Sequence, residues 1–220
     1  MKFHYSTVLS WLVTLLTPLF LIGLALRIML APWFLTVEYN MPYFPADEYG
    51  FTKADRLRWA PYALNYLTNN ADISYLGNLK FDDGMPLYNE RELSHMRDVK
   101  QVTQGGLRAW AVSLAALALL GLWAWRGNWG QAYVQGLRRG GWLVIILAAG
   151  FGGFAAVAFW QFFAFFHSLF FTGDSWIFLF SDTLIRLFPM QFWQDVFTWV
   201  GAIVIGGALL LAFGLKPKTA

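Results

Sequence analysis

The chain has 220 residues, of which 58% are hydrophobic and 13% are charged. Soluble domains carry about a quarter charged residues, so this composition excludes an ordinary soluble protein and predicts an integral membrane protein. The net charge is +3 without a basic stripe interleaved with aromatics, and cysteine is absent; we therefore expect no nucleic-acid partner, no thiol nucleophile, no thiolate metal site and no disulfide.

Four stretches are apolar and long enough to cross a bilayer, which takes about 20 helical residues. We expect spans at about 8–34, 107–125, 141–166 and 196–215. The first run is longer than a signal-peptide core and no clear cleavage site follows it, so we expect it to stay uncleaved. The predicted fold is an all-α integral membrane protein with four transmembrane helices, forming a single membrane domain over 1–220.

Acidic and basic residues are divided unevenly between the segments that connect these spans. Every Asp and Glu lies in 37–107 or 167–195, whereas the two termini and the 126–139 connection hold only bases. The positive-inside rule then predicts both termini in the cytoplasm and the two acidic connections outside. The bases behind this orientation are Lys2, Arg126, Arg138, Arg139, Lys216 and Lys218.

The connection between the first two spans, 37–106, is predicted to form a small extracytoplasmic cap, because it is too short to build a large core alone. Within the cap, Thr52 and Asp55 are placed to begin a short helix, TKADRLRWAPYALNYL. Pro61 lies inside this pattern and is expected to interrupt it.

An amphipathic helix is expected over about 89–104, where apolar residues recur three positions apart. Asn89 is its predicted N-cap, and acidic residues in its first turn favour the helix dipole. We expect Gly105 and Gly106 to end this helix before the second span begins.

Two of the three histidines stand out. His95 lies in LYNERELSHMRDVK (87–100), and His167 lies in FFAFFHSLFF at the end of the third span. The predicted topology brings both to the outer side at similar depth, whereas His4 lies alone in the N-terminal tail. Histidine titrates near neutral pH and is a common general acid or base, so we expect one site that contains His95 and His167.

Three kinds of chemistry fit this pair. A metal site would need a third ligand, for which Glu92 and Asp98 are the candidates. A serine acyl-enzyme would need a cross-pair such as Ser94 with His167, because adjacent helical residues point in different directions. Acid–base catalysis by two histidines demands least, so we expect no metal and no cofactor.

The residues around both histidines resemble the bacterial lipoprotein intramolecular transacylase family, a group of four-span membrane proteins. The similar blocks read YNERELSHMRDVK (88–100) and FHSLFFTGDSW (166–176). DRLRWAPYALNYL (55–67) and LIRLFPMQFW (184–193) are similar as well, so the resemblance covers nearly the whole chain.

The resemblance implies an acyltransferase of the bacterial cytoplasmic membrane. Its substrates would be diacylglyceryl-modified lipoproteins, lying among membrane lipid at the outer leaflet. The sn-2 acyl chain would move to the α-amine of the same cysteine, which gives the lyso form of the lipoprotein. The resemblance places the two essential histidines of the family at His95 and His167.

On this reading His95 is the expected general base, oriented by Glu92 or Asp98, and His167 the acid or oxyanion stabiliser. Tyr88 and Arg91 are expected to support the site, and Arg97 and Trp176 to bind substrate, with either arginine placed to hold a polar group of the lipidated cysteine. The alternatives are a metal-dependent intramembrane hydrolase or transferase, and a non-enzymatic lipid-binding subunit.

Overall fold

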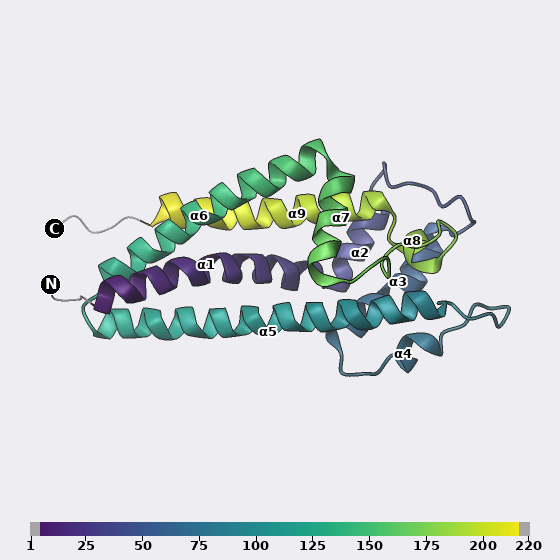
Figure 1. Ribbon diagram of the computed structural model, residues 1–220, viewed down its shortest axis with the longest axis horizontal. Helices are drawn as coiled ribbons and strands as arrows, with labels where there is room; N and C mark the ends of the chain where they lie inside the picture. The colour runs from purple at the N-terminus through teal and green to yellow at the C-terminus, as the bar shows by residue number, and fades with distance from the viewer. Residues whose placement is uncertain (1–4, 216–220) are drawn as a thin grey trace. The chain divides into compact units, whose positions relative to one another are not determined.

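The computed structural model describes residues 5–215, and this part of the chain is helical throughout except for connections and one isolated bridge between Lys80 and Pro86. The predicted all-α class is confirmed. Lys2, His4, Lys216 and Lys218, named above, lie outside the described residues. The helices (Figure 1) are α1 (Tyr5–Met29), α2 (Pro32–Tyr39), α3 (Lys53–Thr68), α4 (Ser74–Gly77), α5 (Glu90–Arg126), α6 (Gly130–Val157), α7 (Phe159–Phe170), α8 (Thr183–Leu187), α9 (Met190–Leu209) and the π-helical turn η1 (Leu210–Gly214).

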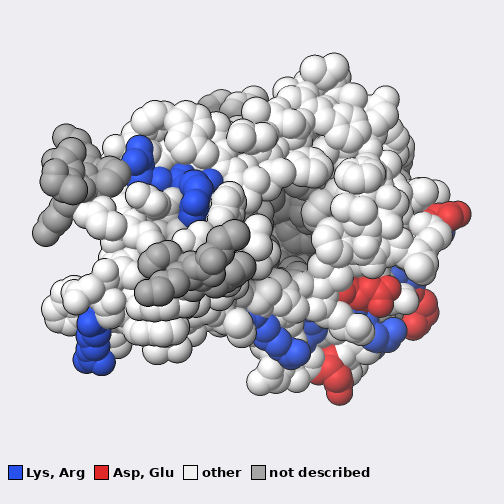
Figure 2. Space-filling view, turned by 60° about the vertical axis from the view of Figure 1, so that its left-hand side comes forward, with Lys and Arg blue, Asp and Glu red and all other residues white. Residues whose placement is uncertain are grey.

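Within residues 5–215, four helices are long and apolar enough to cross a membrane: α1, α5, α6, and α9 together with η1. The 37 residues of α5 rise about 56 Å, against about 30 Å of hydrocarbon. Charged residues recur along α5 up to Arg108, so the apolar 109–125 is the part of this helix whose composition suits a membrane span. Most of the surface in Figure 2 belongs to uncharged residues, as expected for a protein immersed in lipid.

Three helix boundaries differ from those expected. The prediction that Gly105 and Gly106 end a helix is wrong, because α5 passes through both without a break (Figure 1). A glycine costs a helix interior about 1 kcal/mol, which is too little to stop a helix that packs along its length. Pro61 likewise lies inside an unbroken α3. The expected span 141–166 is divided instead at Ala158, whose backbone leaves the helical region between α6 and α7.

The contacts divide the chain into two compact units, where the sequence suggested one domain. The first unit combines α1 up to Arg27, α5 from Gly106, α6, and α9 from Trp199 with η1. A side chain on Gly136 of α6 would lie 2.6 Å from the carbonyl oxygen of Ser10, so glycine is needed for α1 and α6 to pack this closely. The core of this unit comprises Leu21, Ala25, Val144, Val204 and Ala208.

The second unit comprises 28–105 and 159–198 and contains every candidate site residue. Its α3 begins as predicted, with a capping box in which Thr52 and Asp55 bond each other's backbone N–H groups. Arg56, only 5% exposed, fastens α3 to its surroundings by donating to the carbonyl oxygens of Arg186 at 2.9 Å and Pro45 at 2.7 Å. These hydrogen bonds hold the short helices of the unit in place around the site.

Candidate active site

Two helices of the second unit bring the histidines together. His95 lies near the start of α5 and His167 on α7, and their ring centroids are 6.3 Å apart with planes inclined by 21°. Both side chains are buried, each with 8% of its surface exposed. The two rings are close enough for one small reacting group to bridge them once it gains access to the site.

Aromatic side chains enclose the two imidazoles. The rings of Phe171 and Phe178 lie 5.0 and 5.3 Å from His95, measured between centroids. Those of Phe163 and Trp176 lie 4.1 and 4.6 Å from His167. Sequence analysis named only Trp176 among these, because single rings cannot be told apart within an aromatic-rich segment.

Burial sets the charge state of the pair. Burial among apolar side chains, together with the nearby His167, lowers the pKa of His95 to about 4. Burial also lowers the pKa of His167, against the opposing effect of its hydrogen bond to Phe163. Both imidazoles are therefore neutral at pH 7, and a neutral imidazole can accept a proton.

The two histidines differ in their hydrogen bonds. Nδ1 of His167 lies 2.8 Å from the carbonyl oxygen of Phe163. A carbonyl can only accept, so Nδ1 carries the proton and Nε2 holds the free lone pair. Nδ1 of His95 is buried and has no partner among the described residues, which leaves a polar atom unsatisfied inside the site.

Glu92 or Asp98 was expected to orient His95, but the carboxyl oxygens of Glu92 accept from backbone N–H groups instead. Its Oε1 accepts from the backbone N–H of Leu184 at 2.6 Å, and its Oε2 from that of Asn89 at 2.8 Å. Oδ1 of Asn89 accepts from the N–H of Glu92 at 3.0 Å, which confirms Asn89 as the cap of α5. Glu92 thus joins the start of α5 to α8, and burial raises its pKa to about 7.

Four other residues were predicted to support the site or to bind substrate: Arg91, Tyr88, Arg97 and Asp98. Nη2 of Arg91 donates to the carbonyl oxygen of Asp174 at 2.6 Å. Tyr88 is 3% exposed, its hydroxyl has no partner among the described residues, and burial raises its pKa. Arg97 is exposed and Asp98 half-buried. Neither makes a side-chain hydrogen bond to His95 or His167 within the described chain.

The positions of the serines and of the possible metal ligands bear on the two other chemistries, a serine acyl-enzyme and a metal site. Ser168 donates its hydroxyl to the carbonyl oxygen of Phe165 at 2.7 Å, and Ser94 is exposed. Between residues 5 and 215, no three His, Asp or Glu side chains cluster closely enough to hold a metal ion.

A buried acid in the same unit was not foreseen from the sequence. Glu38 on α2 has no exposed surface. Burial, together with the like charge of Asp195, raises its pKa to about 8. Glu38 therefore keeps its proton at neutral pH. In the sequence, Glu38 is a single acid beside an apolar stretch. Nothing there indicates an effect of Asp195, which lies 157 positions later (195 minus 38).

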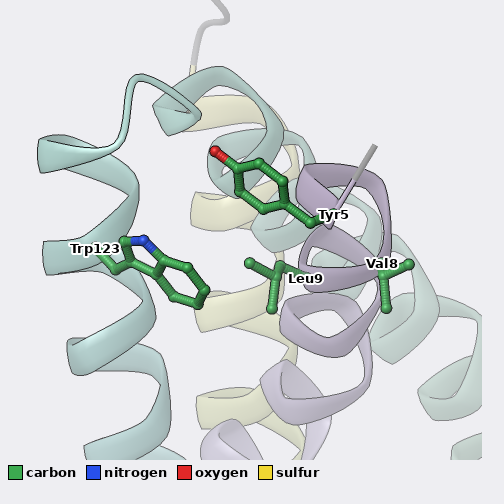
Figure 3. A pocket seen from close by; sticks show the side chains of 4 residues that line it. All are labelled: Tyr5, Val8, Leu9 and Trp123. Atoms are coloured by element: carbon green, nitrogen blue, oxygen red, sulfur yellow. The ribbon is translucent and has the colours of Figure 1, made fainter. Parts of the chain in front are cut away.

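An apolar groove in the first unit offers a contrast. Tyr5 and Leu9 of α1 point toward Trp123 of α5 around a space of about 390 Å³, which Val8 also lines (Figure 3). No residue that titrates near neutral pH lines this groove, so we place no chemistry there.

Comparisons with known proteins bear on the family. The family model described as lipoprotein intramolecular transacylase Lit matches residues 11–193. An uncharacterised protein of Aquifex aeolicus (strain VF5) is 26% identical over 218 residues, which cover 96% of this chain and 94% of that protein.

Solved structures show the same fold. The membrane-integral lipoprotein intramolecular transacylase Lit from Bacillus cereus matches with a TM-score of 0.78 and 19% identity, over 94% of this chain and 93% of that one. A histidine-to-arginine variant of that protein matches with a TM-score of 0.72 and 19% identity, over 94% and 89% of the two chains. The resemblance seen in the sequence is confirmed, and because the family model covers most of its length, this chain belongs to the lipoprotein intramolecular transacylase family.

Proposed function

We propose that this transacylase moves the sn-2 acyl chain of a diacylglyceryl-cysteine lipoprotein to the α-amine of the same cysteine. The amine nitrogen forms an amide bond with the acyl carbon, the ester C–O bond breaks, and one proton passes from nitrogen to the glyceryl oxygen. The observation that carries the proposal is the pair of neutral, buried imidazoles 6.3 Å apart. The product is the lyso form of the lipoprotein.

The roles of the two histidines are proposed in the reverse of the order expected from the sequence. His167 is the general base, because its Nδ1 proton is held by the carbonyl of Phe163 and its Nε2 lone pair is therefore available. His95 is neutral at pH 7, so one of its ring nitrogens carries a proton that it can donate, and the proton that His167 takes from the amine then replaces it. His95 then serves the departing glyceryl oxygen.

Orientation of the bound substrate supplies much of the remaining rate enhancement. The nucleophile and the ester belong to one molecule, so holding that molecule in a reactive conformation replaces an encounter between two molecules. No acyl-enzyme is required for this transfer. Trp176, 4.6 Å from His167, is placed to contact the moving acyl chain. The exposed Arg97 is proposed to contact the polar part of the lipidated cysteine, because Arg91 is already bonded to Asp174.

The site is proposed to lie at the outer leaflet, with both termini in the cytoplasm and the cap (37–106) outside. The uneven distribution of acids and bases supports this orientation. The spans are proposed near the limits given by α1, 109–125, α6 and α9. The lipid chains of an outer-leaflet lipoprotein would then lie at the depth of the two histidines.

A reporter lipoprotein tests this function. Its N-terminal peptide would be isolated from cells with and without this gene, in a host that lacks other N-acylating activity. Mass and fragmentation should show an N-acyl, S-monoacylglyceryl cysteine only when the gene is present. An unchanged diacylglyceryl cysteine with a free amine in both strains would contradict the proposal.

A further inference from the structure

The segment 171–182, which joins α7 to α8, covers both imidazoles; we call it the covering segment. It contains no helix. Phe171 and Phe178 lie against His95, and Trp176 lies against His167. With this cover in place, each histidine keeps only 8% of its surface exposed. A lipid ester therefore cannot contact both imidazoles freely in this conformation.

The covering segment is tied to the start of α5 by two exposed side chains. Arg91 donates from Nη2 to the carbonyl oxygen of Asp174 at 2.6 Å. Asn89 donates from Nδ2 to Oδ1 of Asp182 at 3.1 Å. One tie lies near each end of the segment. Gly173, next to the first tie, has a φ of +63°, a conformation that glycine adopts without strain.

The unsatisfied Nδ1 of His95 also points to movement of this cover. A buried polar atom without a partner is unfavourable, and within the described chain this atom has none. A polar group of the substrate could satisfy it once the covering segment lifts. Closure afterwards would keep water from the ester, so that the acyl group passes to the amine and not to water as free fatty acid.

We propose that the covering segment opens to admit the lipidated cysteine and that Arg91 is the positioning residue that holds it closed over the histidines. This rests on the proposed function for its substrate. Arg91 acts through the carbonyl of Asp174 and takes no part in the proton transfers. It thereby limits both access to the imidazoles and loss of the acyl group to water.

Chemical modification tests the tie without any turnover. Purified Arg91→Met protein would be treated with diethyl pyrocarbonate, and modification of His95 and His167 followed by mass spectrometry. The net worth of one hydrogen bond corresponds to a change of about 2- to 13-fold in an opening equilibrium, so both rates should rise by that factor. Arg91→Lys should restore part of the protection. Unchanged rates in Arg91→Met would overturn the proposal.

The matched control is Arg58→Met, the same change at an exposed arginine whose partner is Asp82 and not the covering segment. Its modification rates should equal those of the unmodified sequence. Unfolding temperatures of all variants would be measured alongside. A rise in both Arg91→Met and Arg58→Met would mean general loosening, and would overturn a specific role for Arg91.

Cross-linking tests whether opening is needed for turnover. The chain has no cysteine, so Arg91→Cys with Asp174→Cys introduces the only thiols. A short bis-maleimide would join them across the distance that the arginine spans. Cross-linked protein should convert a diacylglyceryl lipopeptide at least about ten times more slowly than the same variant capped with N-ethylmaleimide. Equal turnover would overturn the proposal. Failure of the unmodified sequence to convert the lipopeptide would instead count against the proposed function. The rates of diethyl pyrocarbonate modification would still test whether Arg91 holds the covering segment closed.

Discussion

Glu92 offers a test of how burial and hydrogen bonding compete in this site. Its side chain is 1% exposed and accepts two backbone N–H groups, from Leu184 and Asn89. Burial raises its pKa from 4.5 to about 7, against the lowering effect of these two donors. Glu92→Gln keeps the volume and one acceptor but does not titrate, so the difference between the two proteins isolates the charge.

The sign and size of the effect follow from the raised pKa. Between pH 4.5 and 7 the unfolded chain is ionised while folded Glu92 keeps its proton, so the free energy of unfolding falls as the pH rises. About 2.5 pH units at about 1.4 kcal/mol each give at most roughly 3–4 kcal/mol, or about 6–16 °C in unfolding temperature. Relative to Glu92→Gln, the unmodified sequence should lose stability by up to this amount over that pH range.

Thermal unfolding in detergent, followed by tryptophan fluorescence at several pH values, measures this difference. A difference that does not change with pH would refute the reasoning that burial dominates. A gain by the unmodified sequence as the pH rises would show that the two N–H donors hold Glu92 as a carboxylate.

Three further predictions concern packing, orientation and metal dependence. Arg56→Met removes two hydrogen bonds made by a buried guanidinium and should lower the free energy of unfolding by about 2–4 kcal/mol. Arg58→Met, whose ion pair with Asp82 is exposed, should leave the unfolding temperature unchanged, and equal effects would contradict the role given to burial. Asp83→Cys should react with an impermeant thiol reagent in intact cells and Gln135→Cys should not, and reversed labelling would refute the orientation. Activity should survive strong chelators, because two histidines without a third donor make a poor metal site; loss of activity that one added metal restores would support the metal-dependent alternative.

Those features that depend on composition and local pattern could be predicted from the sequence. Four apolar stretches predict the all-α class, and Asn89 is a sound N-cap prediction because its partner lies three residues away. The continuity of α5 could not be predicted, since two adjacent glycines are a local signal that a long packed helix overrides. The two histidines lie together as expected, while their catalytic roles stay a prediction.

Long-range partners explain most of what the sequence did not reveal. Glu92 lies three positions from His95, yet its carboxylate binds the backbone of Leu184, 92 positions along the chain. Arg91 donates a hydrogen bond to the backbone carbonyl of Asp174. Every residue has such a carbonyl, so the sequence does not indicate this partner. The charge of Asp195 raises the pKa of the buried Glu38, although 157 positions separate the two residues in the sequence. In each case the deciding partner is set by tertiary structure.

The most direct test of the central claim measures conversion of a diacylglyceryl lipoprotein to its lyso form by histidine variants, in cells without other N-acylating activity. His95→Asn and His167→Asn should each lower the rate by about 10²–10⁴-fold, and the double variant should be little worse than the worse single one, because the two act in one step. All three proteins should accumulate in the membrane, and His4→Asn should convert normally. Near-normal conversion by a well-expressed His95→Asn or His167→Asn protein would remove that residue from the mechanism and contradict the account.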